Sequence, residues 1–268
     1  MDGISTLLAR TDHDQPSVFM VENLLREGRR QLDRAEVDIP RVCLLDPDGD
    51  VVRFIEQSGI GAVSPGWACY HTTLFECDVD DLRIGVLGCA VGGSFAVLVA
   101  EELFASGCNL VVSLTSAGRI GASASHEPYV IIDRALRGEG TSYAYLPPAP
   151  AVCADASLAE TAHESLVAAG IAAIRGTSWT TDAPFRETAS AIADARRQGA
   201  IAVEMEAASL YALASARGFP LLCLAHLTND MAVEPGDFEK GAANGAEMAL
   251  HIVSIISRAL GELVEGVG

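Results

Sequence analysis

The sequence predicts a single α/β domain of three layers, in which helices flank a central mixed β-sheet. The strongest indication is a strand at 82–88, a glycine loop, a helix at 95–105 and a strand at 110–114. This succession within about 30 residues is a βαβ unit, which places its two strands in parallel. Only 6% of the residues are aromatic, whereas Ala, Val, Leu and Gly dominate, as suits helices packed on a sheet. With 268 residues, 50% of them hydrophobic, one domain can bury a full core.

The other elements follow from apolar runs and helical periodicity. Residues 1–40 are interpreted as an N-terminal helical segment, with a helix beginning near Val18, and residues 41–268 as the α/β domain. Further strands are predicted at 41–45, 67–75, 172–175, in the apolar run up to Val203, and at 220–225. Further helices are predicted after the turn at 46–50, at 158–169 and 188–198, from Ala207 onward, and at 243–260. Residues 119–160 are expected to form a long, less regular connection.

The charge balance limits the partners. Lys and Arg total 18 against 36 Asp and Glu, a formal net charge of −18, so the surface should repel nucleic acid and anionic membranes. The seven cysteines form no CxxC pair and lie in apolar runs, as expected for reduced core residues of a cytoplasmic protein. The N-terminus has no apolar signal region, and the uncharged stretch 84–100 is too short and glycine-rich for a membrane span. The six histidines show no metal-ligand spacing, so no metal site is predicted.

The stretch 202–211 is the centre of the sequence, because it joins an apolar run to a helix and places two carboxylates at the junction. Glu204 and Glu206 are two residues apart, so both would point the same way if the chain is still extended there. From Ala207 the apolar residues follow helical periodicity. The simpler alternative is that two acids open a helix and complement its dipole.

Polar clusters follow the predicted strands, and in open α/β sheets ligands gather beyond the carboxyl ends of strands. The loop 88–94 lacks dinucleotide-binding and P-loop spacing, yet a glycine loop before a helix offers backbone N–H groups to an anion. Ser94 is the candidate N-cap of that helix. Thr115 and Ser116 could donate hydroxyl hydrogen bonds to an oxyanion. The alternatives are close strand–helix packing for the loop and satisfaction of a strand end for the hydroxyls.

Two further clusters could contact a heterocycle. Trp179 offers an indole face for stacking, although it could equally be a core residue. Asp230 follows Asn229 after an apolar strand, where partial burial could raise its pKa and suit it to general-acid chemistry. The alternative for Asp230 is a turn residue.

Together these motifs resemble the nucleoside phosphorylase family, which includes purine nucleoside and uridine phosphorylases and related nucleosidases. The resemblance rests on Val-Glu-Met-Glu-Ala-Ala at 203–208, with the glycine loop, the stretch 176–182 and Asp230 in the expected order, and extends from about residue 41 to 260. It implies a nucleoside phosphorylase-like fold. It also implies that Glu206 binds the ribose 2′ and 3′ hydroxyls, with Glu204 beside it and Met205 under the sugar.

The resemblance implies roles for the other clusters as well. Trp179 would lie against the base, and Asp230 would protonate the leaving base, as in purine-specific members. Phe185-Arg186 is similar to the arginine that uridine phosphorylases use on uracil, so these cues conflict. Asn229 is grouped with the substrate-binding residues. The phosphate-binding candidates are Gly92, Gly93, Ser94, Thr115 and Ser116.

Two departures from the family concern the phosphate site. Gly49 and Ser113 stand where family phosphorylases carry arginines. Losing both removes the positive charge usual around phosphate. Arg53, Arg119 or an arginine of a neighbouring subunit could substitute.

The resulting expectation is a homo-oligomeric enzyme, dimeric or hexameric, that cleaves the N-glycosidic bond of a nucleoside. Inorganic phosphate would be the co-substrate and no other cofactor is expected. Two alternatives stay open: a nucleosidase that uses water, and a catalytically silent nucleoside-binding protein.

Overall fold

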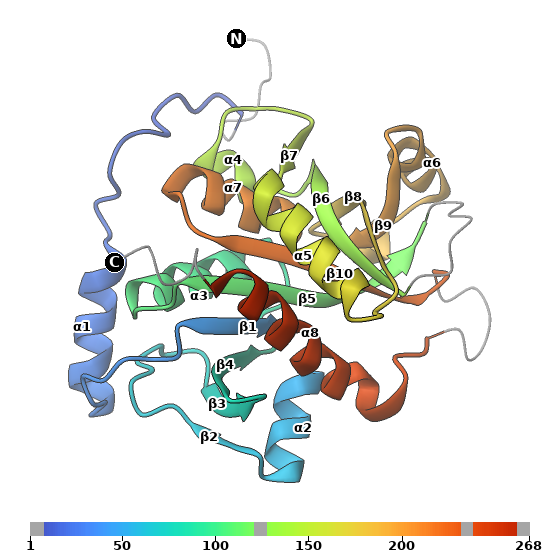
Figure 1. Cartoon of the computed structure of the whole chain (residues 1–268). Coiled ribbons are helices and arrows are strands. Elements are labelled where there is room, and N and C mark those ends of the chain that lie inside the picture. The colour runs from blue at the N-terminus through green and yellow to red at the C-terminus, as the bar shows by residue number, and fades with distance from the viewer. Residues whose placement is uncertain (1–7, 121–127, 232–237, 262–268) are drawn as a thin grey trace.

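The computed structural model describes residues 8–120, 128–231 and 238–261 and confirms the predicted α/β/α domain with a central mixed sheet (Figure 1). The strands are β1 (Val42–Asp46), β2 (Gly61–Val63), β3 (Leu74–Val79), β4 (Leu82–Gly88), β5 (Leu110–Arg119), β6 (Tyr129–Gly138), β7 (Ala151–Cys153), β8 (Ala173–Thr181), β9 (Ala200–Glu204) and β10 (Leu221–Asn229). The helices are α1 (Val21–Leu32), α2 (Asp50–Ser58), α3 (Gly93–Ala105), α4 (Ser142–Tyr145), α5 (Ala156–Ala168), α6 (Ala189–Arg197), α7 (Ala207–Arg217) and α8 (Ala246–Ala259), with 3₁₀ turns η1 (Pro184–Arg186) and η2 (Ala242–Gly245).

The centre of the sheet consists of two parallel groups joined by antiparallel seams, and β2, β3 and β7 add antiparallel strands outside these groups. Strands β4, β1, β5 and β10 form one group, and β6, β8 and β9 form the other. Because β10 pairs with both β5 and β6, and β9 pairs with β5, five of these strands close into a ring. The β5–β9 seam pairs only Gly118 with Val203 and Arg119 with Ala202, so the carboxyl ends of two antiparallel strands meet there.

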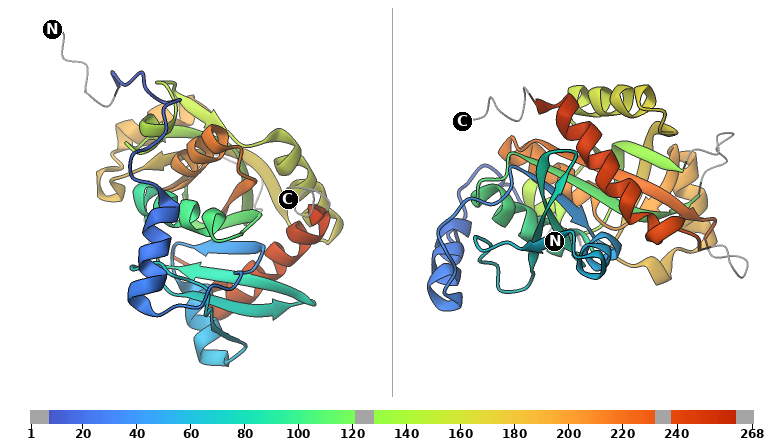
Figure 2. Two further views of the ribbon diagram at one scale, coloured as in Figure 1. Left: turned by 90° about the vertical axis from the view of Figure 1, so that its left-hand side faces the viewer. Right: turned by 60° about the horizontal axis from the view of Figure 1, so that its bottom comes forward.

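Side chains of the central strands alternate between two cores, as the period of a strand requires. In β1, Cys43 and Leu45 join the core formed with α3 and α7, whereas Leu44 joins the core formed with α2, α5 and α8. The two views of Figure 2 show helices on both sides of the sheet. This burial of both sheet faces explains why the central strands read as continuous apolar runs.

Several predicted elements need correction. Residues 128–160 are not an irregular connection, because they contain β6, α4 and β7; residues 121–127 of that stretch lie outside the described part. The strand predicted at 67–75 begins only at Leu74, since the segment before it folds on itself through bonds from Trp67 Nε1 to Thr72 Oγ1 and from His71 N–H to Cys69 Sγ. Strands β5, β8 and β10 also continue into the polar residues predicted to follow them.

The N-terminal segment contains α1, which packs against α3. Within the described residues, no helix has both the length and the apolar character that a membrane crossing requires.

Candidate functional site

Glu204, the last residue of β9, binds the start of α7. Its Oε2 accepts hydrogen bonds from the backbone N–H groups of Glu206 and Ala207, both at 2.7 Å. Its Oε1 accepts hydroxyl bonds from Ser178 at 2.9 Å and Thr180 at 2.5 Å. The side chain is buried, and all four bonds satisfy a charge that would otherwise be costly. The Glu204 carboxylate therefore accepts hydrogen bonds from the first N–H groups of α7, as the helix-opening interpretation expects.

Glu206 faces a different way, because the chain leaves the extended conformation at this residue (φ −127°, ψ −37°). Its Oε1 accepts a 2.7 Å hydrogen bond from the Gly92 N–H. Its Oε2 is buried and has no hydrogen-bond partner within the described chain. Burial, and secondarily the charge of Glu204, raises the pKa of Glu206 to about 8. A buried carboxyl with one open oxygen can accept from, or donate to, a ligand hydroxyl.

The glycine loop meets this carboxyl at the start of α3. Gly92 is the N-cap residue of α3, with a φ of +86° that favours glycine. The N-cap prediction for Ser94 is therefore wrong, and Ser94 lies exposed inside the first turn. Gly93 packs so closely on α7 that a Cβ would overlap Ser209 Oγ. The close-packing interpretation thus holds for Gly93, while the Gly92 N–H is already bound to Glu206.

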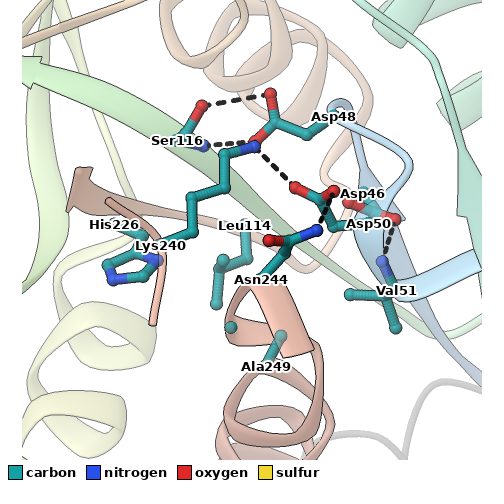
Figure 3. Close-up of a pocket in the computed structure, with 11 residues that line it drawn as sticks. Asp46, Asp48, Asp50, Val51, Leu114, Ser116, His226, Lys240, Asn244 and Ala249 are labelled. Atoms are coloured by element: carbon teal, nitrogen blue, oxygen red, sulfur yellow. Dashed lines mark hydrogen bonds and ion pairs between the residues drawn. The ribbon is translucent and has the colours of Figure 1, made fainter. Parts of the chain in front are cut away.

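A second acidic group lies in the turn between β1 and α2 and lines a small pocket (Figure 3). Asp48 accepts two bonds from Ser116, at 2.9 Å from the backbone N–H and at 3.0 Å from Oγ. Lys240 Nζ lies 3.2 Å from Asp48 Oδ2 and 2.5 Å from Asp50 Oδ2. Thr115 is buried beside Ser116, and its hydroxyl donates to the Ser116 carbonyl oxygen. The hydroxyl cluster predicted from sequence is therefore assembled, but a carboxylate occupies its Ser116 donors.

The two ends of this acidic group carry opposite pKa shifts. Burial raises the pKa of Asp46 to about 6, against hydrogen bonds from the N–H groups of Val51 and Val52, and the charges of Asp48 and Asp50 add to it. Burial would also raise the pKa of Asp50, but hydrogen bonds from Lys240 and Arg53 outweigh burial and lower it. The pocket therefore holds its lysine as an ion pair rather than as an available positive charge.

Neither position expected to carry an arginine could easily do so. Gly49 has a φ of +74°, and a Cβ there would crowd Cys89 Sγ and the Arg53 guanidinium. Ser113 is buried inside β5. Arg53 donates to the Asp48 carbonyl and the Asp50 carboxylate, and Arg119 Nε lies 3.3 Å from Asp230 Oδ1. Both proposed substitutes thus have carboxylate partners of their own.

The residues predicted to contact the base are less enclosed. Asp230 lies just beyond β10 with 73% of its side chain exposed, so the expected partial burial is wrong. The turn there is made by Asn229, whose Oδ1 accepts from the Met231 N–H. Arg186 is exposed in η1, and Met205 is half-buried. Trp179 packs on a small core that includes Leu136 and Val203.

Sequence reasoning missed Asp48 and Lys240. Asp48 stands in an Asp-Pro-Asp-Gly-Asp run that was interpreted only as a turn, although its three acids at alternate positions were a usable signal. Lys240 is 190 residues from Asp50 and belongs to no motif. Among the described residues, no cluster of three or more His, Cys, Asp or Glu side chains is arranged to hold a metal ion.

Comparisons with known proteins identify the family and the fold. Residues 41–260 match the sequence profile of the phosphorylase superfamily. Uridine phosphorylase from Vibrio fischeri is 18% identical, with 83% of this chain and 94% of that chain covered and a TM-score of 0.70. Purine nucleoside phosphorylase from Toxoplasma gondii is 17% identical, with coverages of 86% and 94% and a TM-score of 0.69. AMP nucleosidase from Bacteroides thetaiotaomicron is 19% identical, with coverages of 92% and 100% and a TM-score of 0.70.

No curated protein sequence matches the chain. The structural likenesses confirm the predicted fold, which phosphorylases and a nucleosidase share.

Proposed function

Because the chain belongs to the phosphorylase superfamily, we propose that it cleaves the N-glycosidic bond of a nucleoside and that its nucleophile is water. This proposal departs from the phosphate nucleophile that the sequence resemblance favours. The observation that carries it is the state of two of the expected phosphate-binding residues, Gly92 and Ser116. Gly92 N–H is bound by Glu206, and both donors of Ser116 are bound by Asp48.

Electrostatics supports water over phosphate. A phosphate ion at these donors would displace or adjoin carboxylates, because Asp46, Asp48 and Asp50 line the pocket. Like charges at such distances disfavour one another, most strongly where water is scarce. The pocket lysine offsets only part of this charge, since it pairs with two of the acids. A neutral water meets no such repulsion.

Asp48 is the proposed general base. As the water oxygen bonds to C1′, the C1′–N bond breaks and its electron pair goes to the departing nucleobase. The Asp48 carboxylate takes one proton from the water, and the leaving nitrogen takes up a proton. We assign that proton to Asp230 on the family resemblance alone, since Asp230 is exposed and lies 3.3 Å from Arg119. Two hydrogen bonds from Ser116 hold the Asp48 carboxylate in a fixed direction, which general-base catalysis requires.

Glu206 is the residue proposed to bind the ribose hydroxyls. Its Oε2 is buried without a partner in the described chain, which is costly unless a ligand completes it. A pair of adjacent ribose hydroxyls supplies such a partner. The same acid lies near Asp48, whose charge also contributes to the raised pKa of Glu206. The sugar and water sides of the reaction would therefore adjoin.

Phosphorolysis is the second candidate, because Lys240 could turn to a phosphate if Asp48 moved away. The discriminating experiment is a panel of purine and pyrimidine nucleosides, and of their 5′-monophosphates, assayed for free base with and without phosphate. Hydrolysis predicts base release at equal rates in both conditions. Base release that requires phosphate would support phosphorolysis instead. A panel with no turnover but with measurable nucleoside binding would support the catalytically silent alternative.

Asp230 has its own test, based on the leaving group. Asp230→Asn should slow cleavage of natural nucleosides by about 10²-fold, because the departing base needs a proton. A riboside of p-nitrophenol leaves as a stable anion, so the same variant should cleave it at nearly the wild-type rate. Equal losses on both substrates would remove Asp230 from the general-acid role.

We also propose that the enzyme is a cytoplasmic homo-oligomer. Val91, Leu98 and Tyr70 are large apolar side chains that stay exposed in the isolated chain, and all seven cysteines are free thiols. Analytical ultracentrifugation should give a mass at least twice the 28.0 kDa of one chain. A monomeric mass at micromolar concentration would contradict the proposed homo-oligomer.

A further inference from the structure

Lys240 lies in the pocket at the end of β1 but belongs to no motif that links the chain to its family. Only 14% of its side chain is exposed, and its ammonium group contacts Asp48 and Asp50 at 3.2 and 2.5 Å (Figure 3). A lysine that gives up most of its hydration in this way is held there by its partners. The ion pairs of Lys240 with Asp48 and Asp50 are therefore part of the structure of the pocket.

We propose that Lys240 is a positioning residue of the hydrolytic site, which keeps the Asp48 carboxylate ionised and directed along Ser116. This inference rests on the proposed function, because it assigns a role relative to the general base. Lys240 itself does not touch the reacting atoms in this account.

The groups around Asp48 explain why a cation is needed. Asp46 and Asp50 lie in the same turn, and Glu206 contributes a further acid from the start of α7. His226 on β10 faces the pocket, but burial and the charge of Lys240 lower its pKa, so it is neutral at physiological pH. Arg53 reaches Asp48 only through the backbone carbonyl and gives its charge to Asp50. Among the residues that the structure describes, Lys240 is thus the cation that meets the Asp48 carboxylate itself.

The effect of the pairing is visible on Lys240 itself. Burial would lower the pKa of Lys240, but hydrogen bonds and charge from Asp50 and Asp48 outweigh burial and raise it. The lysine therefore stays charged over the whole physiological range. Without it, several carboxyls would share a small pocket, and each would bind protons more readily. A base that is already protonated cannot accept a proton from water.

The test compares Lys240→Met with Arg53→Met, which removes an equal charge from the same acidic group but leaves the Asp48 carboxylate paired. The measurement is the pH dependence of kcat/KM. Lys240→Met should move the acidic limb to higher pH by about one unit or more, because an adjacent cation lowers a carboxyl pKa by about 1–3 units. Arg53→Met should move it by less than half as much. Lys240→Arg should keep the limb near the wild-type position.

A second readout does not depend on activity. With aspartates labelled with ¹³C at the side-chain carboxyl, the NMR titration of Asp48, assigned through Asp48→Asn, should shift to higher pH in Lys240→Met. Equal limb shifts in the two methionine variants, or an unshifted Asp48 titration, would overturn the positioning role. If instead Asp48→Asn retains full hydrolysis, the general-base assignment fails, whatever Lys240 does to the titration. Circular dichroism of each variant confirms that the comparison is made between folded proteins.

Discussion

The two carboxylate groups of the site differ in what compensates their charge. Glu204 and Glu206, at the junction of β9 and α7, are buried and are held by backbone N–H groups and hydroxyls. The aspartates between β1 and α2 are held partly by cations, Lys240 and Arg53. Burial and the charge of Glu204 raise the pKa of Glu206 to about 8. Among the aspartates, burial raises the pKa of Asp46 to about 6, whereas hydrogen bonds from Lys240 and Arg53 lower the pKa of Asp50.

This difference separates two chemical roles. When environments push the pKa values of neighbouring acids apart, one tends to carry a proton and another to accept one. On this basis Glu206 suits hydrogen bonding to sugar hydroxyls. The Asp48 carboxylate suits proton removal from water because two hydrogen bonds from Ser116 fix its direction. Both roles use carboxylates that bond expected phosphate donors: Glu206 accepts from the Gly92 N–H, and Asp48 accepts from Ser116.

The largest expected effect comes from removing the base. Asp48→Asn keeps the size of the side chain but cannot take a proton, so kcat should fall by about 10²–10⁴-fold. Asp50→Asn is the matched control, since Asp50 also pairs with Lys240 but does not bond Ser116, and its loss should be less than about tenfold. Steady-state kinetics at neutral pH measures both. Similar losses in the two variants would show that the acidic pocket acts only as a whole.

On the other side of the comparison, the expected effect is on stability. Glu204→Gln replaces two acceptor oxygens by one and turns an NH₂ group toward donors, which should lower the free energy of unfolding by about 1–3 kcal/mol. Glu160→Gln, at an exposed position on α5, is the control and should change it by less than about 0.5 kcal/mol. Urea unfolding followed by circular dichroism gives both values. An unchanged stability in Glu204→Gln would mean that its four bonds contribute nothing net.

The free energy of unfolding should also depend on pH. The pKa of Glu206 is about 8 in the folded protein against an ordinary value of 4.5, so between these pH values the folded state binds a proton that the unfolded state has lost. Stability from this group is therefore present at low pH and is lost as pH rises, by up to about 1.4 kcal/mol per pH unit. Glu206→Gln should remove this slope. Parallel pH–stability curves for wild type and variant would contradict the assignment.

The fold was predictable where sequence pattern and environment agree. The βαβ unit at 82–114 reads directly from apolar runs and a glycine loop. Strand β6 was missed because Asp133, Arg134 and Arg137 interrupt its apolar pattern. The structure satisfies Arg137 with the Ser142 hydroxyl and the carbonyls of 146 and 147, contacts that only the folded chain creates.

The sequence pointed to candidate residues of the site but not to the partners that these residues contact. The motif identified Glu206, and the structure gives it an open buried oxygen. Gly92 of the glycine loop donates to Glu206, and Ser116 lines the pocket of the aspartates. Their partners could not be foreseen, because Asp48 is 68 residues from Ser116 and Lys240 comes from near the end of the chain. Local patterns carry no information about such distant contacts.

The most direct test of the central claim is ³¹P NMR during turnover of an unphosphorylated nucleoside with inorganic phosphate present. If water attacks C1′, free base accumulates while the phosphate resonance keeps its full intensity and no sugar phosphate signal appears. A ribose 1-phosphate resonance that grows in step with the released base would contradict the account.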